Sequence, residues 1–157
     1  MTDVYRRNVG IVVYNQNGKV LWCERKDLPG QWQFPQGGIE ANESFLQAAQ
    51  RELKEETSIT SVKLKAYISE PLCYDFPPEV AKRFNKKGQA MNWVLYRFCG
   101  DESEINLQTE NPEFINRKWV DIDEAPKNIV DFKSDVYKKM TAVFKPYIAE
   151  DADYESR

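Results

Sequence analysis

The chain has 157 residues and a formal net charge of -3, with 41% apolar, 30% charged and 13% aromatic residues. This composition is typical of one soluble globular domain, and the net charge excludes a general positive coat for nucleic acid. The sequence contains no histidine, which excludes Ser-His-Asp catalysis and zinc sites of the HExxH type.

Cysteine usage and hydropathy indicate a cytoplasmic protein. Cys23, Cys73 and Cys99 are far apart and odd in number, so we expect reduced, mostly buried thiols and no disulfide. No apolar run reaches membrane-spanning length, and the first ten residues contain no signal-peptide core. We therefore expect no membrane partner.

The first elements expected along the chain are two strands joined by a tight turn. The segments Asn8–Tyr14 and Lys19–Arg25 are rich in apolar residues, and Asn17-Gly18 between them is a hairpin signal. A loop is expected over Lys26–Gln33. A short strand over Phe34–Gly38 then leads into a tight turn, because this segment is too rich in proline and glycine for a helix.

The strongest predicted helix covers Ser44–Thr57. Ser44 is followed three residues later by Gln47, which is a capping-box pattern, and the interior consists largely of good helix formers. Further strands are expected at Ser61–Ser69, Asn92–Cys99 and Arg117–Asp121. A second long helix is expected over Asp131–Ile148. Strands interspersed with two long helices predict an α/β fold with a mixed sheet between helices.

Residues 1–149 are expected to form a single domain, because no repeat, low-complexity linker or shift in composition divides them. Residues 150–157 are acidic and weakly apolar, and we expect them to form a frayed tail.

The segment Arg51-Glu52-Leu53-Lys54-Glu55-Glu56 is the most informative part of the sequence. At roughly 100° per residue, the three glutamates share an arc of roughly 100° on one helix face. Their mutual repulsion has two explanations: a solvated acidic face, or oxygen ligands for a hard divalent cation such as Mg²⁺ or Mn²⁺. The surrounding motif favours the cation.

That motif resembles the Nudix box, Gly-x5-Glu-x7-Arg-Glu-U-x-Glu-Glu-x-Gly-U, in which U is aliphatic. Five residues separate Gly37 from Glu43, and seven separate Glu43 from Arg51, after which the acidic segment follows in register. Every defined position matches except the late glycine, which is Ser58 here. That glycine normally serves the turn after the helix, so the departure concerns local backbone geometry more than chemistry.

The resemblance extends to the bacterial RNA pyrophosphohydrolase branch, also described as (di)nucleoside polyphosphate hydrolases. It covers roughly Tyr5 to Tyr147, and it is carried by Tyr5-Arg6-x-Asn8-Val9-Gly10, Trp32-Gln33-Phe34-Pro35-Gln36-Gly37-Gly38, Glu104-Ile105-Asn106-Leu107-Gln108-Thr109, Pro112-Glu113-Phe114 and Phe132-Lys133-x-Asp135-Val136-Tyr137. The segment Gly88–Trp93 lacks lysines that some members carry there, which affects the expected affinity for RNA or the substrate preference.

The resemblance implies a Nudix α/β/α sandwich with a central mixed sheet. It also implies that Glu52, Glu55 and Glu56 are metal ligands, for Mg²⁺ with Mn²⁺ or Zn²⁺ as alternatives. Glu43 and Arg51 would brace the loop and helix as an ion pair. Without histidine, a carboxylate must act as general base or orient the water, and the candidates are Glu56 and Glu113.

Other residues are assigned by chemical type and by their place in the family motifs. Gly37 and Gly38 would allow positive φ and close backbone approach, or simply form the turn into the helix. Local positive charge for phosphate would come from Arg6 and Lys133, which are otherwise ordinary surface cations. Phe132 and Tyr74 are candidates for packing against a nucleobase, although core packing is the usual role of such residues, and the family motif around Phe132 favours stacking for that residue only.

One basic stretch has two open interpretations. Lys82-Arg83-Phe84-x-Lys86-Lys87 is expected to be a loop that either guides the 5′ end of an RNA or is a solvated run of charge.

The implied activity is metal-dependent hydrolysis of phosphoric anhydride bonds. The main hypothesis is removal of pyrophosphate from 5′-triphosphate RNA to leave 5′-monophosphate RNA, a reaction of mRNA decay. The first alternative is hydrolysis of dinucleoside polyphosphates such as diadenosine tetraphosphate, releasing ATP. The second is a noncatalytic nucleotide- or RNA-binding module. The sequence leaves open the number of metal ions, the oligomeric state and any protein partner.

Overall fold

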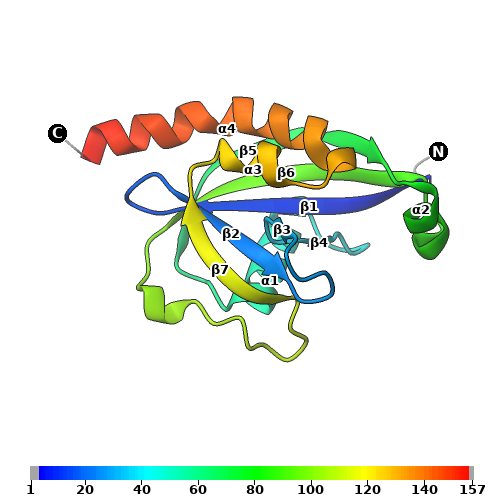
Figure 1. The fold of residues 1–157 in the computed structure, drawn as a ribbon. Coiled ribbons are helices and arrows are strands. Elements are labelled where there is room, and N and C mark those ends of the chain that lie inside the picture. Colours follow the sequence, from blue (N-terminus) through cyan, green and yellow to red (C-terminus); the bar gives the residue numbers. More distant parts are fainter. Residues whose placement is uncertain (1–3, 156–157) are drawn as a thin grey trace.

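The structure, a computed structural model, describes residues 4–155 and places a mixed sheet between helices. Helix α1 (Phe45–Thr57) covers one face and helix α4 (Ser134–Glu155) covers the other (Figure 1). The seven strands are β1 (Tyr5–Tyr14), β2 (Val20–Arg25), β3 (Trp32–Gln33), β4 (Gln36–Gly38), β5 (Val62–Asp75), β6 (Gly88–Phe98) and β7 (Phe114–Val120). The predicted α/β/α arrangement is confirmed.

The main path of the sheet runs β3-β2-β1-β6-β5, with β4 paired to β1 and β7 paired to β2. Strands β1 and β6 are parallel over their whole common length, and the other pairs are antiparallel. β1 therefore lies at the centre of the sheet, which explains the apolar run Val9–Tyr14 in its second half.

Alternate residues of β1 supply two separate cores. Val9, Ile11 and Val13 pack with the buried side of α1. Val12 and Tyr14 belong to the core beneath α4. A strand covered on both faces needs apolar side chains at both phases of its two-residue repeat, so β1 cannot show the polar alternation of a half-exposed strand.

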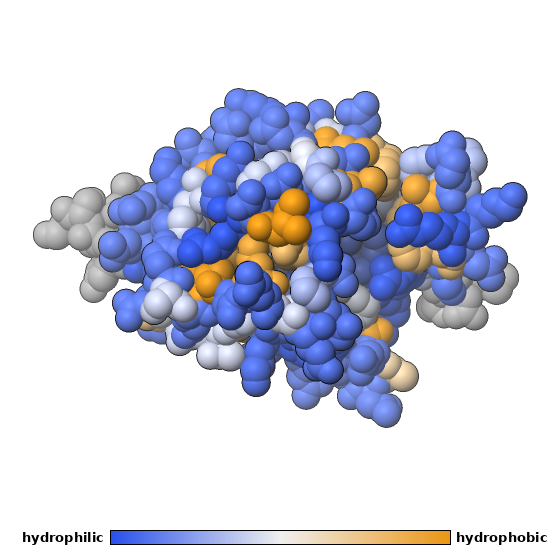
Figure 2. All heavy atoms as spheres, turned by 60° about the horizontal axis from the view of Figure 1, so that its bottom comes forward, coloured by the Kyte–Doolittle hydropathy of each residue, from blue (hydrophilic) through white to orange (hydrophobic). Residues whose placement is uncertain are grey.

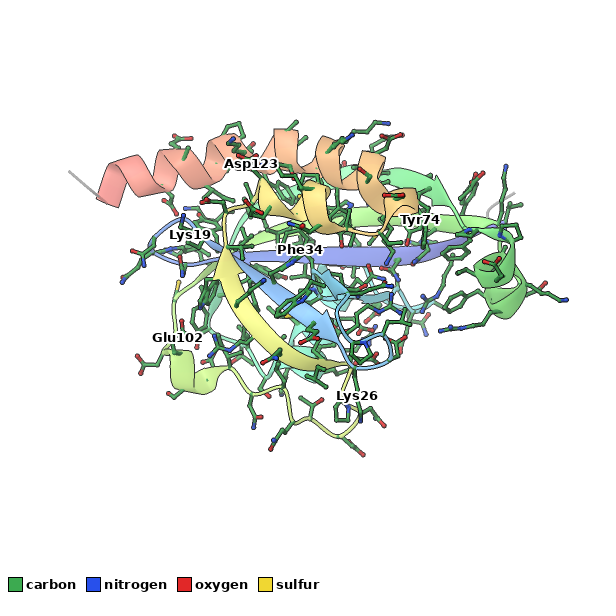
Figure 3. All side chains as sticks on the ribbon, viewed as in Figure 1. Lys19, Lys26, Phe34, Tyr74, Glu102 and Asp123 are labelled. Carbon is green, nitrogen blue, oxygen red and sulfur yellow. The ribbon has the colours of Figure 1, made fainter. Side chains whose placement is uncertain are left out.

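The core beneath α4 is rich in aromatic rings. The ring of Phe34 stacks on Tyr137 with centroids 5.5 Å apart and meets Trp22 edge-on at 4.9 Å. Figure 3 shows Phe34 in the middle of the molecule. Edge-on and offset ring pairs contribute about 0.5–1.5 kcal/mol beyond their buried area, so this cluster fixes α4 against the sheet.

The N-terminal hairpin is confirmed by the pairing of Tyr14 with Val20 and by the positive φ of Gly18 (73°). The strands begin or end up to several residues away from their predicted bounds. The expected loop Lys26–Gln33 ends in the short strand β3, which pairs with β2. Two one-turn 3₁₀ helices and the short helix α3 are found at Glu102–Glu104, Asp131–Lys133 and Glu124–Asn128.

Three predictions need correction. Lys82, Arg83 and Phe84 belong to a helix, α2 (Pro78–Phe84), rather than to a loop, because Pro78 occupies a first-turn position that needs no amide donor. Cys73 and Cys99 are exposed, so only one of the three free thiols is buried.

The third correction concerns the C-terminal helix. It begins at Ser134 after a 3₁₀ turn and continues through Glu155, into the segment 150–157 that was predicted to be frayed. Asp151 in that segment accepts a hydrogen bond from Tyr14, so ordered structure extends past residue 150. None of the described helices is long and apolar enough to cross a membrane.

Candidate active site

The site begins with the turn from β4 into α1. The Ser44 hydroxyl accepts from the Gln47 amide at 3.1 Å, and the Gln47 side chain accepts from the Ser44 amide at 2.9 Å. The predicted capping box is thus confirmed. It satisfies two amides that would otherwise lack partners at the start of the helix. Ala48, Ala49 and Leu53 are buried against the sheet, and this fixes which face of α1 turns toward β4.

Arg51 ties this turn to the acidic face of α1. Its guanidinium donates to both carboxylate oxygens of Glu43 and also to the carbonyl of Gly38 at 3.0 Å. The predicted ion pair is therefore present. Hydrogen bonds from Arg51 lower the pKa of Glu43 to about 2. The same guanidinium donates to Glu52 at 2.9 Å and to Glu55 at 3.2 Å, so it links the loop to the helix acids.

Gly37 and Gly38 serve the site through the space they leave free. A Cβ atom on Gly37 would lie 2.0 Å from the carboxyl carbon of Glu52, so the carboxylate would have to move. A Cβ on Gly38 would lie 3.3 Å from a terminal nitrogen of Arg6. Neither glycine has a positive φ, so that part of the prediction was wrong and the close approach was right.

Ser58 ends α1 in the left-handed conformation, with φ 68° and ψ 5°. Its amide donates to the Lys54 carbonyl, and its hydroxyl donates to the Asn106 carbonyl at 2.9 Å. The serine therefore adopts the backbone geometry that a glycine would adopt with less strain, and the departure from the motif leaves the helix end intact.

Glu52, Glu56 and Glu113 line the same cleft. Glu56 is only 6% exposed, and one of its oxygens accepts from the Gln36 amide at 3.3 Å. Burial raises the pKa of Glu56 well above its usual value, and the charges of Glu52 and Glu113 raise it further. Burial also raises the pKa of Glu52, although Arg51 partly offsets this. The cluster therefore holds negative charge that the nearby cation does not fully compensate.

This donor set fits a hard divalent cation in its chemistry, since carboxylate oxygens are the preferred ligands and the acids repel one another without it. Within residues 4–155, however, no group of three or more acidic or thiol side chains is already arranged around one point. One terminal nitrogen of Arg51 donates to both Glu52 and Glu55, so the guanidinium occupies the point on which these two carboxylates converge. Glu55 is also the most exposed of the helix acids, at 57% of its side chain.

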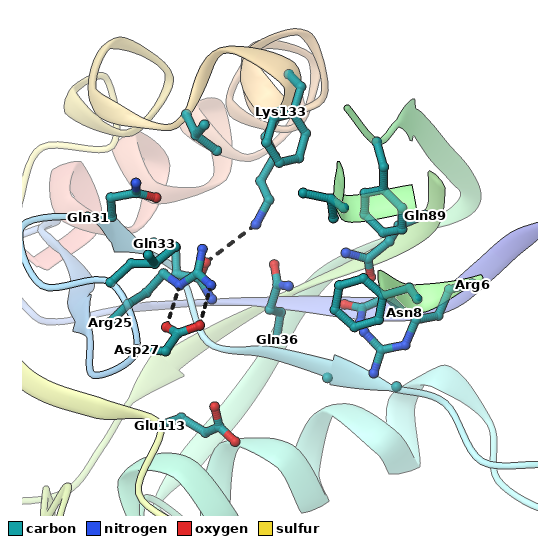
Figure 4. Close-up of a pocket in the computed structure, with 18 of the residues that line it drawn as sticks. Arg6, Asn8, Arg25, Asp27, Gln31, Gln33, Gln36, Gln89, Glu113 and Lys133 are labelled. Carbon is teal, nitrogen blue, oxygen red and sulfur yellow. Dashed lines mark hydrogen bonds and ion pairs between the residues drawn. The ribbon is translucent and has the colours of Figure 1, made fainter. Parts of the chain in front are cut away.

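The cleft has a volume of about 500 Å³, and its other walls carry cations and aromatic rings. Figure 4 shows Lys133 reaching into it from above, Arg6 at one side and Glu113 below. The Lys133 ammonium donates to Gln33 at 3.4 Å, and burial lowers its pKa to about 8. Phe132 lines the same surface. The structure thus brings three of the four predicted substrate-binding residues to the acidic cluster.

Tyr74, the fourth, lies behind this surface. It is 7% exposed, its hydroxyl accepts from the Gln89 side chain, and its ring packs against Phe132 at 5.6 Å and Phe76 at 5.8 Å. Figure 3 shows it near the end of the sheet that carries α2. Its position corrects the prediction of direct base contact: Tyr74 supports the residues that line the cleft.

Sequence reasoning missed several polar residues of the cleft. Asn8, Gln36 and Gln89 come from three different strands and line its floor. Each keeps a buried side-chain amide atom without a hydrogen-bond partner within the described part of the chain. Such atoms are costly unless a ligand or water pairs with them, so they indicate a binding surface. The signal available in the sequence was the presence of asparagine and glutamine side chains within or close to segments predicted to be strands.

The cation Arg25 was also missed. It lines the cleft while paired to Asp27 by two hydrogen bonds of 3.0 and 2.7 Å, drawn as dashed lines in Figure 4. This pair holds the loop after β2 against the cleft opposite Arg6.

An α/β/α sandwich with a braced, acidic helix facing a polar cleft defines a class of phosphate-chain hydrolases, and the chain matches the NUDIX domain over residues 4–140. The protein belongs to the Nudix family, whose hydrolases generally use divalent metal ions.

Its similarity to individual relatives extends over most of the chain. It is 41% identical to an RNA pyrophosphohydrolase of Caulobacter vibrioides, over 98% of this chain and 93% of that protein. It is 40% identical to the chloroplastic Nudix hydrolase 26 of Arabidopsis thaliana, over 92% of this chain and 71% of that protein. Among solved structures, a binary complex of the C. elegans Ap4A hydrolase superposes with a TM-score of 0.66 at 22% identity, covering 90% of this chain and 98% of that one, which shows the shared fold.

Proposed function

We propose that this protein removes pyrophosphate from 5′-triphosphate RNA and leaves 5′-monophosphate RNA. The observation that carries the proposal is the 41% identity to the Caulobacter RNA pyrophosphohydrolase over nearly the full length of both chains. The cleft supports it, because cations, aromatic rings and the acidic cluster line one continuous surface. Such a reaction belongs to mRNA decay and takes place in the cytoplasm.

In this proposal the acids of α1 hold the metal. Glu52 and Glu56 are the inner ligands, because both line the cleft, and Glu55 joins from the more exposed side. Mg²⁺ is the proposed ion, with Mn²⁺ and Zn²⁺ as substitutes. A divalent ion held there would supply positive charge to the phosphate oxygens and make water more acidic. Glu43 and Arg51 keep the loop in register with the helix.

Glu113 and Glu56 are the two candidates for the group that orients the attacking water and accepts its proton. Glu113 is exposed and immediately precedes β7, whose first residue, the buried Phe114, anchors the chain. It lines both the cleft and the neighbouring depression around Arg51 and Glu55, so water reaches it directly. Glu56 is better placed to be a ligand, because burial makes its uncompensated charge costly. We therefore assign Glu113 as general base.

The opposite walls hold the substrate. Arg6 and Lys133 would contact the polyphosphate, and Phe132 would pack against a base. Gly38 leaves room for the Arg6 guanidinium, and Gly37 leaves room for Glu52, so the substrate and metal sides of the cleft meet at these two residues.

Product analysis tests the proposal. Purified protein is incubated with a 5′-triphosphate RNA or with diadenosine tetraphosphate, each with Mg²⁺ or Mn²⁺, and the products are separated by chromatography. We expect 5′-monophosphate RNA together with pyrophosphate or successive phosphates. Glu113→Gln should lower kcat on RNA about 100-fold or more while metal binding persists. Glu70→Gln, the same change at an exposed position on β5, is the matched control.

Each other outcome contradicts a part of the proposal. Release of ATP from diadenosine tetraphosphate with no RNA product would favour the dinucleoside polyphosphate hydrolase. Binding of nucleotides with no hydrolysis of either substrate would favour a noncatalytic module. Full turnover by a normally folded Glu113→Gln protein would remove Glu113 from the mechanism.

A further inference from the structure

The outer end of the cleft carries an aromatic ring with two guanidinium groups beside it. Phe84 is the last residue of α2 and is 37% exposed. The guanidinium carbon of Arg6 lies 5.4 Å from its ring centre, and that of Arg83 lies 5.2 Å away. All three residues line the cleft. Figure 2 shows the end of the molecule that carries α2 as mainly hydrophilic, with small hydrophobic areas.

This arrangement is not explained by the stability of the fold. Neither Arg6 nor Arg83 forms an ion pair with an acid among the described residues, whereas Arg25, Arg51 and Arg117 each do. Two like charges beside one half-exposed ring repel each other, and each cation–π contact at an exposed site is worth only about 0.5–1 kcal/mol. Guanidinium groups outside any close ion pair and a ring that is 37% exposed are instead the features that bind a phosphate and a base.

A row of aromatic rings connects this surface to the interior of the site. Phe84 stacks on Phe76 with centroids 5.4 Å apart, and Phe76 meets Tyr74 at 5.8 Å. Tyr74 in turn packs against Phe132 at 5.6 Å. The ring of Phe84 is therefore held in place from behind, and its position is fixed relative to the predicted base-binding residue deeper in the cleft.

We propose that Phe84 and Arg83 bind the RNA nucleotides that follow the 5′ terminus, with Phe84 stacking on a base and Arg83 contacting a backbone phosphate. This inference rests on the proposed function and adds to it a second point of contact outside the polyphosphate site. Mononucleotides have no downstream phosphodiester, and dinucleoside polyphosphates carry only their bridging chain. The surface therefore selects RNA over both.

The chain offers a matched control beside these residues. Lys82 precedes Arg83 and is also exposed, but it lines a separate depression with Val4 and Asn85 rather than the cleft. Lys82→Gln and Arg83→Gln thus remove the same charge from adjacent positions of one helix. Phe84→Leu removes the aromatic ring, whereas Phe84→Tyr keeps one. Comparing the two variants separates a stacking role of the ring from a structural role of the side chain.

Equilibrium binding without added metal gives the readout. A 5′-triphosphate RNA of eight nucleotides, labelled at its 3′ end, is titrated in a fluorescence anisotropy assay over a series of salt concentrations, with unlabelled ATP as the short competitor. We expect Phe84→Leu to weaken RNA binding about tenfold and Phe84→Tyr to restore it. Arg83→Gln should reduce the slope of log affinity against log salt by about 0.7, the value for one phosphate on a single strand.

ATP competition should be unchanged in all four variants, and Lys82→Gln should match the wild type for RNA. Equal RNA affinity in Phe84→Leu, Arg83→Gln and Lys82→Gln would overturn the inference, as would an equal loss of RNA and ATP binding. If the expected binding differences are found but no variant or wild-type protein cleaves the RNA, the proposed function fails and the docking site stands. Thermal melting monitored by circular dichroism checks the fold of each variant.

Discussion

At the scale of single residues, the proposed active site depends on how tightly the proposed metal side and the proposed substrate side are packed together. Gly37 faces the Glu52 carboxylate and Gly38 faces the Arg6 guanidinium, so adjacent residues of β4 contact opposite partners. The two glycines differ in what a side chain would displace. The carboxylate of Glu52 is held by Arg51, whereas the end of Arg6 is a flexible guanidinium.

Gly37→Ala is therefore expected to weaken metal binding. The added methyl group would overlap the Glu52 carboxyl group, 2.0 Å away, and force it out of its position. We expect metal affinity to fall about 10-fold to 100-fold, as it does when a group that orients a ligand is lost. Isothermal titration with Mn²⁺ measures this. Gly38→Ala, which meets only the end of Arg6, is the control, and equal metal affinity in both variants would contradict the proposed role of Glu52.

A pH dependence is expected from Lys133. Burial lowers its pKa to about 8, so the side chain is charged below that pH and neutral above it. If the charged form contacts the substrate, KM for RNA should rise as pH increases from 7 to 9.5, a range above the last phosphate pKa. In Lys133→Arg the guanidinium stays charged, so this rise should disappear. A KM that rises equally in both proteins would remove Lys133 from substrate binding.

At the scale of elements, the two ends of α1 are stabilised in different ways. The N-terminal end is closed by the reciprocal bonds of Ser44 and Gln47. The C-terminal end places Ser58 in the left-handed region, which is unfavourable for a residue with a Cβ atom, and offsets part of this cost with the bond to the Asn106 carbonyl.

Two substitutions at Ser58 separate these contributions. Ser58→Ala and Ser58→Gly both remove the hydroxyl, but only glycine relieves the left-handed backbone. We therefore expect the free energy of unfolding of Ser58→Gly to exceed that of Ser58→Ala by about 1 kcal/mol. Urea denaturation measures the difference. Equal stability of the two variants would mean that the strained conformation costs nothing here.

The elements also differ in how well the sequence predicts them. Helix α1 is marked by its cap and by its periodic apolar face, both of which are local signals, and it was predicted correctly. Helix α2 has only seven residues and no side-chain cap. Its basic residues are as typical of a loop as of a helix. Its position is set by the packing of Phe84 on Phe76, which belongs to the segment that follows β5.

At the scale of the whole molecule, the parallel pair β1 and β6 joins the two cores. Gly10 pairs with Trp93 across this pair, and a Cβ on Gly10 would lie 2.4 Å from the indole ring. The buried ring has no room to move away, because Phe34 and Tyr137 pack against it.

Gly10→Ala should therefore destabilise the whole domain. Overpacking a close-packed core costs about 1–3 kcal/mol, so we expect a loss of this size in the free energy of unfolding. Urea denaturation followed by tryptophan fluorescence measures it. Gly38→Ala, at a position where only a flexible side chain must yield, is expected to cost less. A Gly10→Ala protein as stable as the wild type would show that this core is loosely packed.

The sequence alone determined the family, the acidic helix and the brace between Glu43 and Arg51, because these depend on fixed spacing within one loop and one helix. The tertiary structure decided which side chains meet in the cleft. Asn8, Gln36 and Gln89 are far apart in the chain and become neighbours only through strand pairing, and Tyr74 is withdrawn behind Phe132 by packing. The spacing of residues along the chain is enough to predict local geometry within one loop or helix. Contacts between distant strands depend on the register of the complete sheet, which that spacing does not specify.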